Sequence, residues 1–257
     1  FAGKEKSNKA AELTREAKTL RKEVKVLYHD EDIVILHKPA GMLSQKSEKT
    51  DDSLNDYLQD LCRKNHWVEE ASLEFFRPSV ANRLDRNTSG IVLCGITTKG
   101  LQTLSKTLKD RTISKYYYAL VAGQVKEGRH LKGYLRKDTE KNVVHFSEKA
   151  SEDAVAIETE YQVVRSCKEA SLLKIRLITG KSHQIRAHLA SEGYPIIGDY
   201  KYGDRRINQR VKKDVGVSYQ MLHSCEIDFG KYFGGRVIRD SIPRDFARTM
   251  DYFGLEL

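Results

Sequence analysis

A short polar stretch, residues 82–90, holds the side chains best suited to chemistry. One carboxylate, Asp85, lies between the guanidinium groups of Arg83 and Arg86, and two hydroxyl side chains and a glycine follow. Residues 90–97 have apolar side chains in both phases of a strand, which predicts a strand covered on both faces. A carboxylate at the start of such a strand is held in place, and flanking cations favour its ionised form. An ionised, fixed aspartate can be a nucleophile, a general base or a metal ligand, and a turn aspartate in a surface salt bridge is the alternative.

Three consecutive tyrosines lie in residues 114–123, whose pattern is that of a strand. Strand alternation places Tyr116 and Tyr118 on one face and Tyr117 on the other. An aromatic ring on a sheet can stack on a nucleobase, which contributes about 1–3 kcal/mol per base. Packing in the core or on the sheet surface is the other interpretation for Tyr116 and Tyr118.

A glycine-terminated strand runs into a predicted helix within residues 179–189, for which Ser182 is the expected N-cap. Ile185 and Leu189 are four residues apart and are expected to face the core. Arg186 shares another side of this helix with His183, three residues before it. His183 and His188 are five residues apart, which places the two imidazoles on different faces and argues against a shared metal ion.

Composition limits the class of protein. A chain of 257 residues can bury one large core or two small ones, and no run of apolar residues is long enough to span a membrane. The net charge of +9 favours a polyanionic partner. The four cysteines are widely spaced, which argues against a structural zinc site and for a reducing, cytoplasmic compartment. Because the chain starts at Phe1, we expect it to begin within a longer sequence.

The remaining pattern is one of strands joined mostly by hairpins, with helices between them. A turn at residues 38–41 follows the first hairpin, and Lys38 could hold this turn or contact a phosphate. The predicted elements are strands at 24–29, 33–37, 158–166, 171–179 and 221–229, helices at 53–64, 98–109 and 244–250, a polar excursion at 124–155 with a short strand at 143–146, and a basic loop at 205–213.

The absence of a regular βαβ rhythm predicts an α+β fold with a largely antiparallel sheet. Residues 1–23 read as a charged helical linker, and the folded core is expected to begin at Val24. The basic loop is either a solvated run of charge or a phosphate clamp.

Four motifs occur in order, and together they resemble those of the RluA-type pseudouridine synthases. They are the acidic hairpin with Lys-Pro-x-Gly (30–41), Arg-Leu-Asp-x-x-Thr-Ser-Gly (83–90), Lys-x-Tyr-x-Ala-x-Val (115–121) and Thr-Gly-Lys-x-His-Gln-Ile-Arg (179–186). The resemblance covers about residues 24–250. It implies that residues 24–257 are the catalytic domain. Some relatives carry a small RNA-binding module before that domain, so residues 1–23 are either a charged linker or the tail of such a module. The family usually has histidine where this chain has Asn82, which we interpret as a subfamily difference.

The resemblance implies a pseudouridine synthase fold, a mixed, mostly antiparallel bent sheet flanked by helices and loops. It assigns Asp85 as the catalytic nucleophile, Arg186 as the arginine that pairs with it, and Tyr117 as the ring that stacks on the target uracil. Arg83 would contact a phosphate or occupy the space vacated by the base. The implied reaction needs no cofactor and no metal, and a monomer acting on ribosomal or transfer RNA is expected.

Two rival functions remain at this point. A catalytically inactive RNA-binding or ribosome-assembly protein on the same fold would be expected to have lost Asp85 or Tyr117, and both are present. A metal-dependent nuclease would need further carboxylates beside Asp85, where the motifs supply arginines instead.

Overall fold

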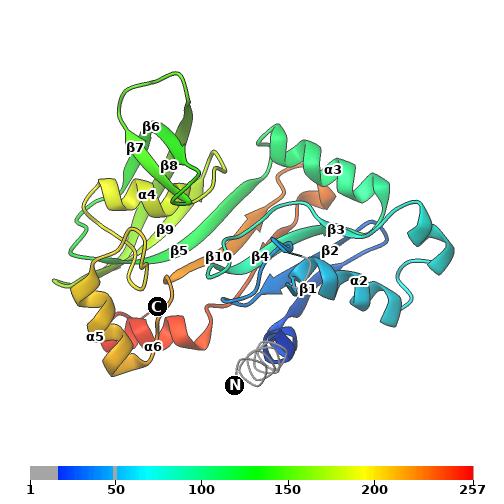
Figure 1. Ribbon diagram of the computed structural model, residues 1–257, viewed down its shortest axis with the longest axis horizontal. Helices are drawn as coiled ribbons and strands as arrows, with labels where there is room; N and C mark the ends of the chain where they lie inside the picture. The colour runs from blue at the N-terminus through cyan, green and yellow to red at the C-terminus, as the bar shows by residue number, and fades with distance from the viewer. Residues whose placement is uncertain (1–16, 49–50, 257) are drawn as a thin grey trace, which may run out of the picture. The chain divides into compact units, whose positions relative to one another are not determined.

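The computed structural model describes residues 17–48 and 51–256 (Figure 1). The chain divides between Asp110 and Arg111 into two compact units. Residues 17–23 are helical, and the rest of the helix predicted for residues 1–23 lies outside the described part of the chain. The assignment of residues 24–257 to one catalytic domain stays a prediction.

The first unit is built on a small antiparallel sheet with the strand order β1-β2-β4, and β3 pairs with β4. Every residue of β2 and β4 is buried, which confirms the strand predicted after Asp85. The elements are β1 Lys25–His29, β2 Ile33–Lys38, β3 Ser79–Val80, β4 Ser89–Gly95, α2 Leu54–Lys64, α3 Thr98–Lys109 and the 3-10 helix η1 Glu70–Glu74.

Two capped helices hold this sheet. The hydroxyl of Ser53 accepts a hydrogen bond from the backbone of Asp56 at the start of α2, as predicted. Thr97 caps α3 in the same way. At Gly100 a Cβ atom would lie only 2.0 Å from the carbonyl oxygen of Asp32, so this position of α3 requires glycine. α3 therefore packs tightly against the strands that fix the Asp85 turn.

The second unit contains a longer antiparallel sheet with the order β11-β10-β5-β9-β8-β6-β7. Its strands are β5 Ser114–Ala122, β6 Arg129–Asp138, β7 Val143–Ser147, β8 Ala154–Ser166, β9 Ala170–Leu177, β10 Leu222–Asp228 and β11 Val237–Arg239. All named strand pairs of both units are antiparallel, which confirms the predicted α+β class with a mostly antiparallel sheet.

The prediction that residues 124–155 form a polar excursion is wrong for most of its length. β6 lies inside it, pairs with β7 and β8, and buries Leu131, Gly133 and Leu135 in alternation. The charged residues on its other face hid this alternation in the sequence.

Three α-helices and one short 3-10 helix complete the second unit: α4 Gln184–Ser191, α5 Arg205–Val215, η2 Phe233–Gly235 and α6 Arg244–Tyr252. The prediction of a basic loop at residues 205–213 is wrong, because this segment is α5. Asp204 caps its first turn and Gly216 ends it in a left-handed conformation. Ser182 is also not the cap of α4, since His183 occupies that position with φ of 54°.

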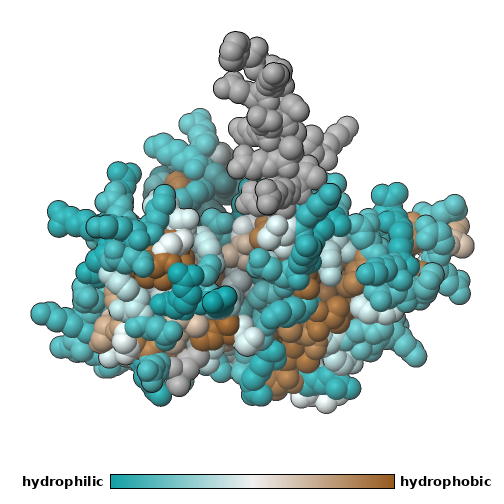
Figure 2. Space-filling model, turned by 90° about the horizontal axis from the view of Figure 1, so that it is seen from below, coloured by the Kyte–Doolittle hydropathy of each residue, from teal (hydrophilic) through white to brown (hydrophobic). Residues whose placement is uncertain are grey.

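Helices cover both faces of the second sheet. α5 and α6 lie side by side in Figure 1 and pack on one face; the buried residues of this cluster include Leu120, Leu172, Val211, Val215, Phe246 and Met250. α4 packs on the other face through a smaller cluster of Leu135, Val144, Ile157 and Ala187. Large exposed apolar side chains, such as Phe75 and Tyr200, are far apart in the chain, and the surface drawn in Figure 2 is mostly hydrophilic.

All four cysteines are free thiols. Cys62, Cys94 and Cys225 are buried, and Cys167 is half-exposed. Burial raises the pKa of Cys62 to about 11 and that of Cys225 to about 12, and it raises the pKa of Cys94 further still. These three thiols are therefore protonated at neutral pH.

Candidate active site

Asp85 lies in a turn that leads directly into β4, as the sequence predicts. Its carbonyl oxygen accepts a hydrogen bond of 3.0 Å from the backbone of Thr88. Asp85 is half-buried, whereas Arg83 and Arg86 on either side of it are exposed. The turn is thus anchored at Ser89, the first residue of β4, and Asp85 itself is not fully buried.

A buried lysine, Lys38, holds the Asp85 turn through hydrogen bonds to backbone carbonyl oxygens. The ammonium of Lys38 donates hydrogen bonds to the carbonyl oxygens of Pro39, Met42 and Arg86 at 3.0, 2.7 and 3.0 Å. Lys38 has no exposed surface, and the backbone of Gly41 also donates to the Arg86 oxygen at 2.9 Å. Of the two roles left open by the sequence, Lys38 therefore holds the turn and does not reach an RNA phosphate.

Burial and hydrogen bonding have opposite effects on the protonation of Lys38. Burial lowers the pKa of Lys38 to about 7, and the negative charge of Asp85 opposes this lowering. The three carbonyl partners match the three N–H donors of an ammonium group, which stabilises the protonated form.

A buried hydroxyl fixes the residue immediately before Asp85. Ser44 Oγ donates to the carbonyl oxygen of Leu84 at 2.9 Å and accepts from the Leu84 amide at 3.0 Å. Ser44 is 2% exposed, so no water replaces these bonds. Leu43 and Ser44 are held in their turn by the first backbone amides of α2, those of Leu54 and Asn55.

We expect Ser44→Ala to lower kcat by about 10-fold to 10²-fold with KM changed only a few-fold, because a displaced catalytic turn costs rate more than binding. It leaves both polar groups of Leu84 buried without their partner, at a cost of about 1–3 kcal/mol in unfolding free energy. Steady-state kinetics and urea denaturation measure the two effects. Ser47→Ala is the matched control, since the exposed Ser47 bonds to Asp51. Full activity of Ser44→Ala, or no recovery in Ser44→Thr, would contradict this role.

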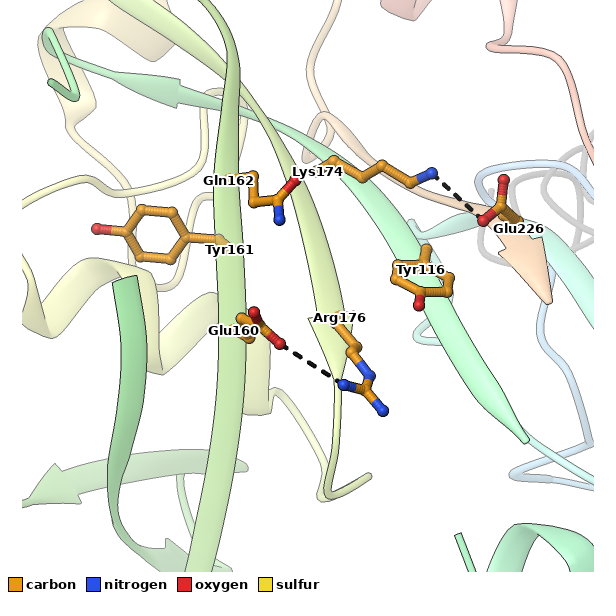
Figure 3. Close-up of a pocket in the computed structure, with 7 residues that line it drawn as sticks. All are labelled: Tyr116, Glu160, Tyr161, Gln162, Lys174, Arg176 and Glu226. Atoms are coloured by element: carbon orange, nitrogen blue, oxygen red, sulfur yellow. Dashed lines mark hydrogen bonds and ion pairs between the residues drawn. The ribbon is translucent and has the colours of Figure 1, made fainter. Parts of the chain in front are cut away.

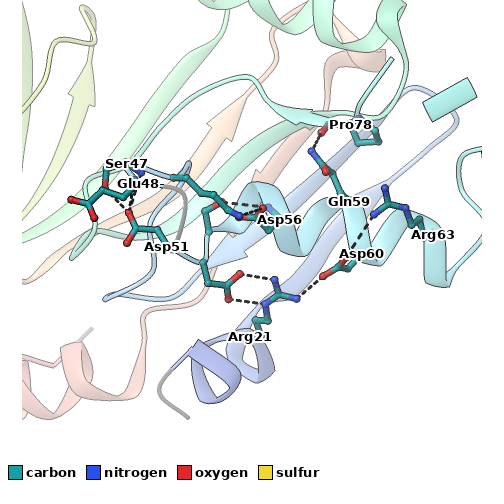
Figure 4. A network of polar contacts seen from close by, with 12 residues as sticks. Arg21, Ser47, Glu48, Asp51, Asp56, Gln59, Asp60, Arg63 and Pro78 are labelled. Atoms are coloured by element: carbon teal, nitrogen blue, oxygen red, sulfur yellow. Dashed lines mark hydrogen bonds and ion pairs between the residues drawn. The ribbon is translucent and has the colours of Figure 1, made fainter. Parts of the chain in front are cut away.

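Figure 4 shows the polar network that holds the start of α2. Arg21 binds both carboxylate oxygens of Asp52, with Nε at 2.7 Å from Oδ2, and its Nη1 lies 2.7 Å from Asp60. These hydrogen bonds raise the pKa of Arg21 above its usual value against the effect of burial. Lys46 pairs with Asp56 at 3.0 Å. The helical residues 17–23 are thereby tied to α2, whose amides hold Leu43 and Ser44.

Tyr117 and α4 lie on the same face of the sheet in the second unit. Tyr117 pairs with Ile175 of β9, which pairs with Tyr161 of β8. Thr159 is two residues from Tyr161 and so shares its face, and its hydroxyl contacts Gln184 and His188 of α4. Tyr117 is 5% exposed. The residues predicted to stack on a base and to carry a guanidinium therefore share one side of this sheet.

Arg186 is held by a second carboxylate that the sequence analysis did not single out. Its Nε lies 2.6 Å from Asp199 Oδ2 and its Nη2 2.9 Å from Oδ1, and the side chains are 7% and 0% exposed. Burial alone would raise the pKa of Asp199, but the bonds from Arg186 outweigh it and the pKa lies below its usual value. The guanidinium also stacks over Tyr202 at 5.2 Å from the ring centre.

The two histidines of this region have different partners. His183 Nδ1 lies 2.9 Å from the Tyr202 hydroxyl, and His188 Nδ1 lies 3.1 Å from Thr159 Oγ1. Burial lowers the pKa of His188 to about 4, so this imidazole is neutral at physiological pH. In the part of the chain that the structure describes, no three histidine, cysteine or acidic residues are grouped to hold a metal ion.

A pocket of about 370 Å³ opens on the other face of β5, where Tyr116 points, and not on the face of Tyr117 (Figure 3). Its charges neutralise one another, with Lys174 at 3.3 Å from Glu226 and Arg176 at 3.7 Å from Glu160. The Lys174 ammonium lies over the Tyr116 ring at 4.9 Å. Tyr116 thus packs on the sheet surface, the alternative that the sequence left open for it.

Asp85 and Arg83 belong to the first unit, and Tyr117 and Arg186 to the second. The structure thus places Asp85 in a turn whose backbone a buried lysine holds, and it places Tyr117 on the same sheet face as the helix that carries the anchored Arg186. The pairing of Asp85 with Arg186 stays a prediction.

In residues 17–48 and 51–256, no helix is long and apolar enough to cross a membrane.

Comparison with known proteins identifies relatives of both units. The model of a family described as RNA pseudouridylate synthase matches residues 32–191. An uncharacterized RNA pseudouridine synthase of Mycoplasma genitalium is 34% identical over 215 residues, which are 82% of this chain and 65% of that protein. Ribosomal large subunit pseudouridine synthase D of Borreliella burgdorferi is 31% identical over 238 residues, 90% of this chain and 68% of that protein.

A solved structure supports the same fold. Human RNA pseudouridylate synthase domain containing 4 superposes with a TM-score of 0.75 at 20% identity, over 96% of this chain and 98% of that chain. The chain spans about two thirds of the length of the two curated relatives.

Proposed function

The chain belongs to the RNA pseudouridylate synthase family, and we propose that it isomerises uridine in large-subunit ribosomal RNA with Asp85 as the nucleophile. The observation that carries the proposal is the Asp85 turn, in which Ser44 holds the carbonyl oxygen of Leu84 before Asp85 and the buried Lys38 holds that of Arg86 after it. Ribosomal RNA is favoured because the relative from Borreliella burgdorferi is named as a large-subunit enzyme. Transfer RNA is the alternative substrate.

The reaction conserves every atom of the substrate. The N1–C1′ glycosidic bond breaks, the uracil rotates, C5 forms a bond with C1′, and the proton on C5 moves to N1. Asp85 attacks either the sugar or the pyrimidine ring and leaves again when the new bond has formed. A base within a helix cannot reach a half-buried carboxylate, so the target uridine is flipped out or lies in a loop.

The other site residues have supporting roles in this proposal. Tyr117 stacks on the uracil, and Arg83 contacts a phosphate or fills the space that the base leaves. Arg186 pairs with Asp85; a guanidinium has five N–H donors and can bind two carboxylates at once, so the bond to Asp199 is compatible with this role. The enzyme is proposed to act as a cytoplasmic monomer without cofactor or metal.

The test is to incubate the protein with large-subunit ribosomal RNA transcripts, and separately with transfer RNA transcripts, in the presence of a metal chelator. We expect pseudouridine in the ribosomal transcript by mass spectrometry, with full-length RNA recovered. Pseudouridine only in transfer RNA would change the substrate. Cleaved RNA that disappears with the chelator would identify a nuclease, and binding without product would identify an inactive RNA-binding protein.

A further inference from the structure

An exposed row of cations runs along α5, the helix that replaces the predicted basic loop. Arg205, Arg206, Lys212 and Lys213 are all exposed, and their spacing of one, seven and eight residues places them on one side of a helix. None of the four forms an ion pair with a described residue, whereas Arg210, one turn after Arg206, pairs with Glu169 at 2.9 Å. We define these four residues as the α5 stripe.

Two residues of the stripe carry a positive charge at the end of α5 where positive charge is unfavourable. Arg205 and Arg206 are the first residues of α5 after the cap Asp204, and its first turn has no acidic residue. The amide groups at a helix N-terminus carry partial positive charge, so cations there are unfavourable, whereas Lys212 and Lys213 in the last turn are favourable. A residue that opposes its local structure is expected to serve a function instead.

Hydrogen bonds connect α5 to Asp199, the residue that holds Arg186. Asn208, buried on the inner side of α5, donates from Nδ2 to the Asp199 carbonyl oxygen at 2.9 Å and accepts from the Gly198 amide at 2.7 Å. Asp199 in turn holds Arg186 through both carboxylate oxygens. One residue of α5 therefore connects the exposed stripe to the guanidinium of the candidate site.

From these three observations we propose that the α5 stripe binds the phosphodiester backbone of the RNA substrate. Cations that carry no internal partner can bind phosphates without first breaking an ion pair. The inference rests on the proposed function for its RNA partner. The contact is independent of base sequence, and it acts on affinity and not on the chemical step.

The test compares two charge-removing double variants of the full chain. Arg205→Gln with Arg206→Gln removes the first-turn half of the stripe. Lys106→Gln with Lys109→Gln is the matched control, because both lysines are exposed on α3 and form no ion pair with a described residue. The probe is a labelled single-stranded oligouridylate of about 20 nucleotides, titrated over a series of salt concentrations, since backbone binding does not depend on sequence.

We expect the α5 variant to reduce the slope of log K against log salt by about 1.4 in magnitude, because each phosphate contact on a single strand contributes about 0.7. The control is expected to leave the slope unchanged. The unfolding temperature of the α5 variant is expected to be equal to or higher than that of the wild type, because two unfavourable cations leave the helix N-terminus.

Equal slope changes in the two variants, or none in the α5 variant, would overturn the proposal. A lower unfolding temperature with an unchanged slope would give the arginines a structural role and overturn it as well. If the wild type fails to bind the oligouridylate, the RNA partner of the proposed function fails with it. If the wild type binds and the α5 variant binds equally, only the stripe is refuted.

Discussion

Asp85→Asn is expected to lower pseudouridine formation by more than about 10⁴-fold, below detection in most assays. The amide has the size of the carboxylate and keeps the turn in place, but it has no negative oxygen that could form a covalent bond to the substrate. RNA binding is expected to stay within a few-fold of wild type. Product is measured by mass spectrometry of digested RNA and binding by filter retention.

The control for this variant is Asp110→Asn, which removes one carboxylate from an exposed position in the same unit. It is expected to behave as wild type in both assays. Asp85→Asn also removes the charge that supports the Lys38 ammonium, so thermal denaturation checks that the turn is intact. If a folded Asp85→Asn protein still makes pseudouridine, another group is the nucleophile.

Asp199→Asn is expected to reduce the unfolding free energy by about 3–5 kcal/mol, because it leaves the buried Arg186 guanidinium without its charged partner. Both side chains are almost fully removed from solvent, so water cannot take the place of the carboxylate. Activity is expected to fall together with stability, since the guanidinium loses the bonds that orient it. Urea denaturation followed by circular dichroism measures the change.

Glu169→Gln provides the matched comparison. Glu169 pairs with Arg210 at the same kind of distance, 2.9 Å, but the two side chains are 57% and 40% exposed. An exposed pair contributes about 0–1 kcal/mol, so this variant is expected to lose little stability. Equal losses in the two variants would mean that burial does not govern the Arg186–Asp199 pair.

The sequence predicted elements whose apolar pattern is simple and whose ends carry a known cap. β4 is apolar in both phases, and α2 and α3 follow the caps Ser53 and Thr97 and have one apolar side. α5 was missed because five cations mask three apolar residues at a spacing of four, Ile207, Val211 and Val215. Only the packing of Val211 and Val215 against the sheet reveals the helical period.

Within the site, the sequence revealed the residues that lie in motifs but not the residues that hold them. Asp85, Tyr117 and Arg186 are identifiable because motifs carry them. The partners that hold them are not, because Ser44 meets Leu84 across 40 residues and Asp199 meets Arg186 across 13. A small polar residue in a turn has no spacing that distinguishes a buried hydrogen bond from a solvated one. Such contacts emerge only when the chain is folded.

The burial of three cysteines has a practical consequence for labelling experiments on this protein. Since three of its thiols are buried with raised pKa values, alkylating reagents at neutral pH will discriminate strongly in favour of Cys167. This residue lies between β8 and β9, away from the Asp85 turn in the chain. A maleimide fluorophore can therefore be attached at a single position of the native protein, without first mutating its other cysteines.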